Sequence, residues 1–273
     1  MAAQVAPSLD VAVAAALAAS DQRIVQIEHE GAALIAKRAG QQPRRLPQAL
    51  FVRWLVKRTT GLSVPLKTLL LSNREGALAH EARRLHALAA SSVHVPRVVR
   101  VTSDFLLLEH CGPSVASLLA RWSADTRRDE LCAEAAALGE FHLAGHWHGA
   151  AQVKNLTRRG GHTWRIDFEE NFGEFLPLAA AQATDLVLLL NSVCLRGPIG
   201  ESETRALLPR MLDAYFAANS DPRVRQELAR ALPLVRRLLR FAAPFKGATR
   251  RNRPHRGVAR LLLLVEALSA RPA

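Results

Sequence analysis

Two side chains near the middle of the chain have the types and the spacing of a divalent-cation site. Asn155 and Asp167 stand at the two ends of residues 156–166, where the letters RRGG at 158–161 include the glycines of a tight turn. We expect a strand, a turn and a second strand here, because a glycine turn lets two short strands pair. Such a hairpin brings the amide of Asn155 beside the carboxylate of Asp167. Hard oxygen ligands of this kind suit Mg²⁺ shared with nucleotide phosphates, so both residues are candidate metal ligands.

A lysine and a glutamate earlier in the chain could face this site. Lys37 ends the second strand of a predicted hairpin at residues 23–37. Its amine can reach the α- and β-phosphates of a nucleotide, or it is a solvent-exposed lysine at a strand end. Glu81 lies beside the apolar stripe of a predicted helix at 74–90. Its carboxylate can pair with Lys37, or with Arg84 one turn along the same helix.

The elements that must position these groups fall into two parts of the chain. Short apolar strands accompany one amphipathic helix up to about residue 110, whereas helical patterns dominate afterwards. We therefore expect an α+β fold, with a small N-terminal lobe on an antiparallel sheet and a larger, mostly helical C-terminal lobe. The patterns predict strands at 23–27, 31–37, 93–100 and 104–109, and helices at 74–90, 114–121, 129–145, 182–193, 201–217, 224–241 and 257–269.

The boundary between the lobes is expected where the letters EHCGP at 109–113 break the strand pattern. If this segment is a hinge, exposed backbone near Glu109 and Cys111 would hydrogen-bond the adenine of a nucleotide. Asp185, near the start of the predicted helix 182–193, either caps that helix or holds neighbouring backbone N–H groups. The predicted division is a helix or disordered lead-in at 1–22, the small lobe at 23–110 and the helical lobe at 111–273.

Composition limits the class of protein. The chain has 273 residues, 49% of them hydrophobic, and a net charge of +13. Three widely spaced cysteines without a CxxC motif fit a reducing compartment and argue against a disulfide framework or a thiolate zinc site. No apolar run approaches the roughly 18 residues that span a bilayer, so we expect no transmembrane segment and a cytoplasmic protein.

The positive charge is concentrated near the end of the chain. Residues 223–260 contain twelve Lys or Arg and one acid, Glu227. Such a basic region attracts nucleic acid, lipopolysaccharide or an anionic membrane surface, which would place the protein peripherally at the inner membrane. The alternative is a solvated helical face.

The order of these residues resembles the atypical protein-kinase-like group that includes Bud32, the RIO kinases and bacterial lipopolysaccharide-core kinases. The residues that carry the resemblance are Lys37, Glu81, His148-Gly149, Asn155, Asp167-Phe168 and Asp185. Bud32-like proteins are closest, because the patterns E-A-R-x-L, V-P-x-V, H-G-x-x-x-x-x-N and I-D-F occur here over about residues 23–193. The resemblance implies a two-lobed kinase-like fold and an ATP- and Mg²⁺-dependent phosphotransferase acting on a protein Ser/Thr or a sugar- or lipid-linked hydroxyl.

The resemblance also implies a role for each matching residue. Lys37 would contact the α- and β-phosphates while paired with Glu81. Asn155 and Asp167 would hold Mg²⁺. His148 and Asp185 would shape the loop that carries the catalytic groups, with Asp185 anchoring the loop around His148.

This chain departs from the family pattern at three places. Ala150 stands where the family has the aspartate that accepts the proton of the substrate hydroxyl, a loss of typically about 10² to 10⁴ in rate. Positioning and metal electrostatics supply most of the acceleration, so activity can survive it. Glu169 replaces the glycine of D-F-G, and without a glycine-rich loop residues 28–31 would have to cover the phosphates. Gln152 and Glu169 are the nearest candidates to orient a nucleophile.

Two other functions compete with an active kinase. A pseudokinase that binds nucleotide or acts as a scaffold gains weight from Ala150. A metal hydrolase could use His142, His146 and His148, although the helical H-E-x-x-H signature is missing.

Overall fold

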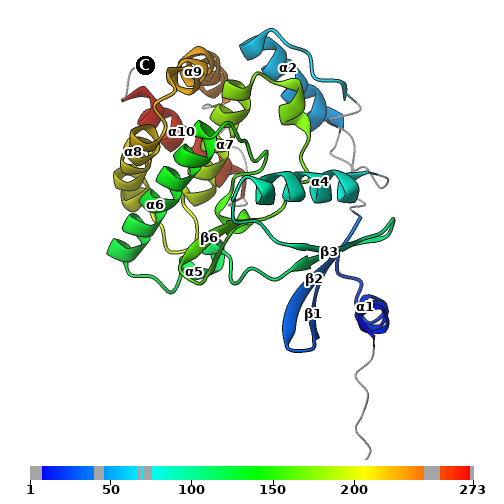
Figure 1. Ribbon diagram of the computed structural model, residues 1–273. Coiled ribbons are helices and arrows are strands. Elements are labelled where there is room, and N and C mark those ends of the chain that lie inside the picture. Colours follow the sequence, from blue (N-terminus) through cyan, green and yellow to red (C-terminus); the bar gives the residue numbers. More distant parts are fainter. Residues whose placement is uncertain (1–7, 40–45, 67–68, 70–75, 243–252, 271–273) are drawn as a thin grey trace, which may run out of the picture.

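A computed structural model describes residues 8–39, 46–66, 69, 76–242 and 253–270. The chain forms an antiparallel sheet with flanking helices first and a mostly helical part afterwards (Figure 1). The predicted α+β class, with a small sheet-containing lobe followed by a larger helical lobe, is therefore confirmed. No helix among the described residues is long and apolar enough to cross a membrane.

The small lobe is built on a four-stranded sheet with the order β1-β2-β4-β3, each neighbour antiparallel. The turn between β1 and β2 has positive φ at Glu30 (50°) and Gly31 (75°), and it separates the two strands expected at 23–27 and 31–37. Helix α1 covers one face of this sheet, where Val13 is buried with Ile27 and Leu34. The elements of this lobe are α1 (Leu9–Ala18), β1 (Ile24–His29), β2 (Ala32–Arg38), α4 (Ala77–Ala90), β3 (Val98–Val101) and β4 (Phe105–Glu109). Helix α2 (Leu46–Thr60) lies between β2 and α4 in sequence but packs on the helical part of the molecule.

Register places Lys37 deep in this sheet. Lys37 pairs with Ile24 of β1 on one side and with Leu106 of β4 on the other. Helix α4 buries the predicted stripe, including Leu78 and Leu85, and Glu81 lies among these apolar residues. The start of the predicted helix at 74–75 lies outside the described residues. The strand expected at 93–100 begins only at residue 98, because the proline at 96 has no N–H to donate to a ladder.

The helical lobe packs around one continuous apolar core that includes Leu131, Phe168 and Leu186. Helices α6 and α8 approach closely, since a Cβ added at Gly139 would lie 2.6 Å from the carbonyl oxygen of Tyr215. Its elements are α5 (Val115–Leu118), α6 (Ala124–Leu143), η1 (Val153–Asn155), β5 (Leu156–Arg159), β6 (His162–Arg165), η2 (Phe172–Phe175), α7 (Leu178–Val193), α8 (Glu201–Ala218), α9 (Pro222–Ala242) and α10 (Arg253–Ser269).

The predicted hairpin between Asn155 and Asp167 is present. Strands β5 and β6 pair from Leu156 opposite Arg165 to Arg159 opposite His162. The turn residues Gly160 and Gly161 both have positive φ, 58° and 79°, which is the conformation that two-residue hairpin turns need.

Helix α7 begins earlier than predicted, at Leu178, directly after Pro177. Asp185 is therefore in the middle of α7 and cannot cap its first turn, so the capping alternative is wrong. The apolar residues between 178 and 182 extend the helix without polar positions that would mark its start.

Candidate active site

The site is centred on the amine of Lys37. Its Nζ lies 2.8 Å from Oε2 and 3.1 Å from Oε1 of Glu81, so the pair expected from the sequence is present. Lys37 is 4% exposed and Glu81 is fully buried, which means that the ammonium and the carboxylate depend on each other for their charge. The alternatives, an exposed Lys37 and a surface pair of Glu81 with Arg84, are wrong.

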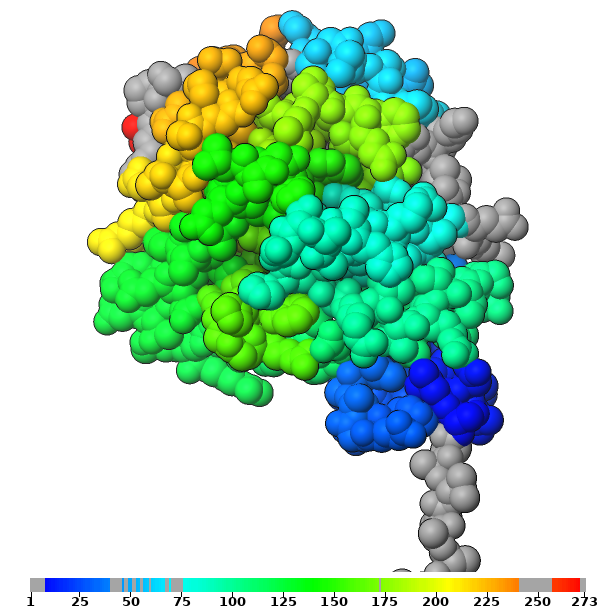
Figure 2. Space-filling view, viewed as in Figure 1, coloured from blue at the N-terminus to red at the C-terminus, as the bar shows by residue number. Residues whose placement is uncertain are grey.

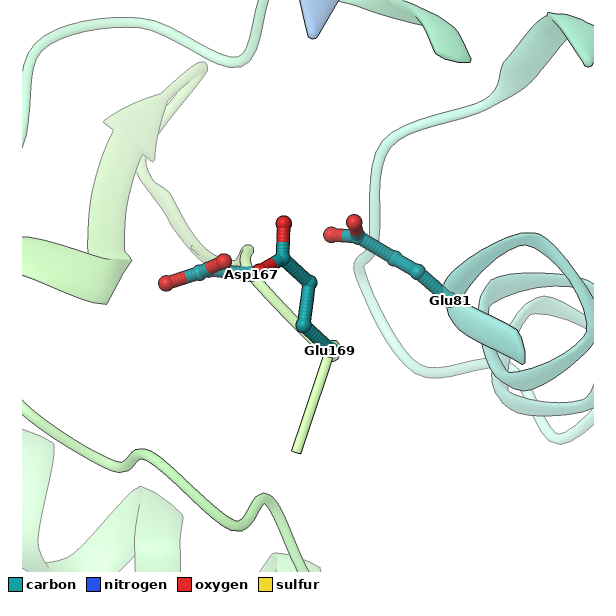
Figure 3. A group of neighbouring side chains, drawn as sticks. All are labelled: Glu81, Asp167 and Glu169. Carbon is teal, nitrogen blue, oxygen red and sulfur yellow. The ribbon is translucent and has the colours of Figure 1, made fainter. Parts of the chain in front are cut away.

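Two more carboxylates contact the same amine. Oδ1 of Asp167 lies 2.7 Å and Oε1 of Glu169 2.6 Å from Nζ of Lys37. Glu81, Asp167 and Glu169 point into one shared space, and one oxygen of each lies within 4.8 Å of the others (Figure 3). Asp167 has φ of 70°, an uncommon conformation for a residue other than glycine that is often found at functional sites.

The electrostatics of this cluster follow from three carboxylates facing one ammonium. Burial alone would lower the pKa of Lys37, but Glu81, Asp167 and Glu169 outweigh it and raise that pKa above its usual value. Burial would raise the pKa of Asp167, yet the charge and hydrogen bond of Lys37 hold it below the usual range. Burial raises the pKa of Glu81 against the opposing effect of Lys37. The cluster thus carries more negative than positive charge around Lys37.

The loop that holds His148 is fixed by Asp185. The buried Asp185 carboxylate accepts the backbone N–H of His148 and that of Gly149, the latter at 2.8 Å. Burial lowers the pKa of His148 to about 4, and its neutral ring stacks on Phe168 with centroids 4.3 Å apart. Asp185 therefore holds backbone N–H groups of this loop, which is one of the two roles expected for it.

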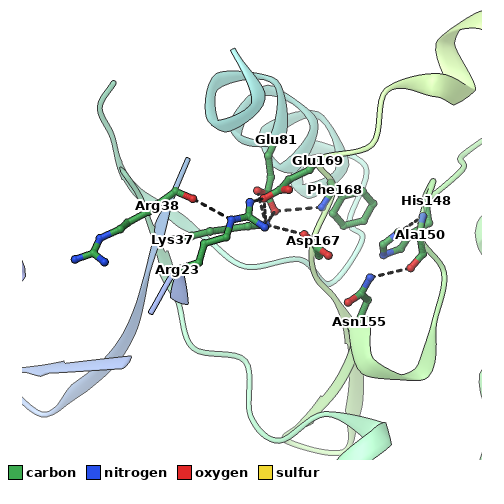
Figure 4. Close-up of polar contacts among 10 residues, drawn as sticks. All are labelled: Arg23, Lys37, Arg38, Glu81, His148, Ala150, Asn155, Asp167, Phe168 and Glu169. Atoms are coloured by element: carbon green, nitrogen blue, oxygen red, sulfur yellow. Dashed lines mark hydrogen bonds and ion pairs between the residues drawn. The ribbon is translucent and has the colours of Figure 1, made fainter. Parts of the chain in front are cut away.

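Asn155 lies next to this loop. The side-chain Nδ2 of Asn155 donates to the backbone carbonyl oxygen of Ala150 at 2.9 Å. The backbone carbonyl oxygen of Asn155 accepts the N–H of Ile166 at 3.0 Å. The second contact joins the two ends of the hairpin, so Asn155 and Asp167 lie at the adjoining ends of β5 and β6 (Figure 4). The sequence spacing therefore predicted this juxtaposition correctly.

The remaining candidates from the sequence, Gln152, Glu109 and Cys111, lie outside the cluster around Lys37. Gln152 is half-buried, and its carbonyl accepts the N–H of Asn155 at 2.8 Å. At the expected hinge, the N–H of Glu109 and that of His110 already bond to carbonyls of the small lobe. The N–H of Cys111 has no acceptor within the described part of the chain. Burial raises the pKa of the Cys111 thiol to about 12, so the thiol stays protonated and uncharged at neutral pH.

Two expectations about the departures from the family pattern were wrong. Residues 28–31 lie at the hairpin turn, at least four positions from the Ile24–Lys37 pair, which is roughly 13 Å along a strand. They are therefore too far to cover groups bound at Lys37. Glu169 faces Lys37 and also pairs with Arg23, on the side of Phe168 away from Ala150, so it is not placed to orient a nucleophile there (Figure 4).

Several residues that hold the site were missed by sequence reasoning. Arg84 donates to the carbonyls of Trp147 and of His148, the latter at 3.0 Å, and its guanidinium lies 3.8 Å from the Trp147 ring centroid. Tyr215 contacts Nδ1 of His142 at 2.6 Å and accepts from Asn219 at 2.9 Å. The contacts of Arg84 with residues 147 and 148, and of Tyr215 with His142, join segments that are more than 60 residues apart in sequence, and no local motif marks them.

The histidines do not form a metal site. His142 is buried between Tyr215 and Asp185, whereas His148 accepts a backbone N–H from Ala150 through Nδ1. His146 instead packs on Phe141. Within the described ranges, the possible metal-binding group of His, Cys, Asp and Glu is the carboxylate cluster around Lys37, which leaves the hydrolase alternative without support.

No family model matches the chain, and no curated protein matches it. The crystal structure of the aminoglycoside phosphotransferase APH(2'')-Ib with ADP bound is similar over 91% of this chain and 92% of its own, with 12% identity and a TM-score of 0.35. At this TM-score the similarity carries no argument about the site.

Proposed function

We propose that this protein is an ATP- and Mg²⁺-dependent phosphotransferase of the atypical, Bud32-like kinase type. The observation that carries the proposal is the buried Lys37–Glu81 pair facing Asp167. Three charged groups from a strand, a helix and the β6 end are brought to one point, although burying them costs free energy. A cost of this kind is typical of functional sites. Residues 23–110 and 111–273 would be the two lobes of the kinase.

The residues fit the phosphates of a nucleotide. Lys37 has an amine that is fixed by Glu81 and retains its charge, as a ligand of the α- and β-phosphates requires. The free N–H of Cys111 and the carbonyl of Glu109 would hold the adenine. The N–H groups of Glu109 and His110 already donate to carbonyls of the small lobe, so we assign the adenine contact to the N–H of Cys111 and the carbonyl of Glu109.

The residues also fit a divalent cation. Asp167 carries a charged carboxylate, and the amide oxygen of Asn155 lies on the same side, which gives the oxygen donors that Mg²⁺ prefers. The excess negative charge of the cluster around Lys37 favours such an ion further. Bound Mg²⁺ would neutralise charge on the transferred phosphoryl group.

The acceptor side lacks a general base. Ala150 is half-buried, and its backbone is held in place by hydrogen bonds to the side chains of His148 and Asn155. We infer slow transfer to a protein Ser/Thr or a sugar- or lipid-linked hydroxyl, with the loop providing position only. Gln152 on the same loop would orient the hydroxyl.

A catalytically degenerate pseudokinase is the second candidate. Two observations favour it: Ala150, and the Glu169 carboxylate that contacts the phosphate-binding amine. Such a protein would bind nucleotide and act through a partner. The basic region 223–260 would then recruit an anionic partner and hold the protein at the cytoplasmic side of the inner membrane.

Nucleotide binding and phosphate transfer test the proposal together. Thermal stability is measured with ATP, with and without Mg²⁺, for wild type, Lys37→Ala and Asp167→Asn. A ligand at 100 times its Kd stabilises a protein by about 2.7 kcal/mol, so saturating ATP should raise Tm by several degrees in wild type only. Glu174→Gln is the control, since this exposed carboxylate lies outside the cluster. Equal stabilisation of all variants would exclude the proposed pocket.

Restoring the missing carboxylate separates the two candidates. Ala150→Asp should raise γ-phosphate transfer or ATP hydrolysis by about 10² to 10⁴ if the other groups are arranged for catalysis. The control is Ala151→Asp, at a neighbouring buried position. No gain in Ala150→Asp, together with intact nucleotide binding, would favour the pseudokinase.

A further inference from the structure

We propose that helix α2 is a docking surface for an anionic lipid membrane. α2 lies at the helical end of the molecule beside α9, away from the β1–β2 hairpin (Figures 1 and 2). One face anchors the helix, where Ala49 and Val56 pack with Val64 and Leu176. A second face, beside the first, is exposed to solvent at Leu46, Leu50 and Trp54.

The open face carries a stripe of large apolar side chains. Leu46, Leu50 and Trp54 are spaced four residues apart and are 51%, 46% and 45% exposed. With Leu62, they make up four of the ten exposed large hydrophobic side chains in the described part of the chain, within 17 residues. Exposed apolar groups gathered on one helix mark an interaction surface, whereas scattered ones are ordinary.

The charges around the stripe have one sign. Residues 31–74 contain nine Lys or Arg and no Asp or Glu. Lys57 and Arg58 follow Trp54 on the last turn of α2, and both are exposed. A helix with aliphatic and indole side chains and basic residues beside them suits the interface of an anionic bilayer, with Trp at the level of the headgroups.

Helix α9 extends the positive charge beside α2. It contains six arginines and one acid, and Arg236, Arg237 and Arg240 are exposed. A membrane surface is broad and would engage both helices together. Each cation near an anionic surface strengthens binding about fivefold, so a few of them add to the apolar contacts.

Other occupants fit this face less well. A second copy of the chain, related by a twofold axis, would pack this surface against itself and offer no Asp or Glu from residues 31–74 to pair with Lys57 and Arg58. Nucleic acid would use the cations but leave Leu46 and Leu50 in water, because its phosphates offer no apolar surface. An anionic bilayer has an apolar layer below a charged one. It can therefore bind the apolar stripe and the basic side chains of α2 at the same time.

The test uses the full chain and lipid vesicles, and it does not depend on catalysis. Co-sedimentation is measured with vesicles of phosphatidylcholine alone and with vesicles containing a quarter of phosphatidylglycerol. Wild type should bind the anionic vesicles, with affinity that falls as salt increases. Asp167→Asn should bind equally, so failure of the proposed kinase function leaves this result unchanged.

Matched variants locate the surface. Leu50→Ser with Trp54→Ser should reduce binding at least tenfold, whereas Val101→Ser with Leu143→Ser, at equally exposed positions elsewhere, should not. Lys57→Gln with Arg58→Gln should weaken binding by about 25-fold, from about fivefold per cation. Because all these side chains are exposed, the variants should fold, and melting curves check this.

The indole gives a direct signal. Anionic vesicles should shift the tryptophan emission of wild type to shorter wavelength, and Trp54→Phe should lose this shift. The proposal is overturned if the α2 variants bind vesicles as wild type does, or if wild type binds neither vesicle. It is also overturned if Lys57 and Arg58 support binding of duplex RNA or DNA while vesicles are ignored, or if the stripe instead drives self-association on size-exclusion chromatography.

Discussion

The Glu169 carboxylate should compete with the phosphates of a nucleotide for the amine of Lys37. Replacing Glu169 therefore tests whether Lys37 is the group that binds phosphate. Oε1 of Glu169 lies 2.6 Å from Nζ of Lys37 and also pairs with Arg23. Phosphates that bind Lys37 must displace this internal anion. Glu169→Gln keeps the shape of the side chain and removes its charge, so nucleotide affinity without Mg²⁺ should increase.

The magnitude follows from the contact. A unit charge pair at 2.6 Å has a gross attraction of about 6 kcal/mol at an effective dielectric constant of about 20. Most of this is offset, because Lys37 keeps Glu81 and Asp167, glutamine retains a hydrogen bond, and the Glu169 side chain is 23% exposed. A charged hydrogen bond contributes about 1.5 to 3 kcal/mol net. We expect a gain near the low end, about 1 to 2 kcal/mol or roughly 5- to 30-fold in Kd.

The assay is calorimetric titration of ADP into wild type, Glu169→Gln and the control Glu174→Gln, first without and then with Mg²⁺. The gain should be largest without the ion. If Glu169 also contributes charge to a bound cation, the gain shrinks when Mg²⁺ is present. An unchanged or weaker affinity of Glu169→Gln in the absence of Mg²⁺ would refute the competition argument. Arg23→Gln should have a smaller effect than Glu169→Gln, because the Arg23 side chain is 40% exposed and its pair is screened.

Three further predictions concern stability. Lys37→Met should destabilise the fold by about 3 to 5 kcal/mol in urea denaturation, because it leaves the Glu81 carboxylate buried without its cation, and adding Glu81→Gln should recover part of this loss. Asp185→Asn should cost about 2 to 3 kcal/mol and lower Tm, since an amide oxygen replaces a carboxylate that accepts two buried N–H groups. Burial lowers the pKa of His148 to about 4 from 6.5, so the neutral ring favours folding above pH 6.5 and this contribution, up to about 3 kcal/mol, is lost as pH falls through 4. His148→Asn should make the free energy of unfolding depend less steeply on pH between 6.5 and 4.5.

Each of these has a clear contrary result. Additive losses in the Lys37 and Glu81 variants would show that the two groups are not coupled. Wild-type stability in Asp185→Asn would mean that the loop is held by other contacts, such as those of Arg84. An identical pH slope in wild type and His148→Asn would show that the imidazole is not the group that titrates.

Much of the fold was predictable because it depends on neighbours in sequence. The β5–β6 hairpin follows from two adjacent glycines with positive φ, and the apolar stripe of α4 follows from helical spacing. The starts of α6 and α7 were less predictable. Ser123 caps α6 before the apolar pattern begins, and α7 extends back to Leu178 through alanines that favour no particular boundary.

The sequence by itself determined which chemistry is available: an amine, three acids and an amide in a fixed order along the chain. Only the tertiary structure decided their partners. Glu169 meets Arg23 across 146 residues of sequence, and Phe168 donates to Glu81 across 87. Contacts at such separations depend on how the sheet and helices pack around the common core, and local propensity contains no information about that packing.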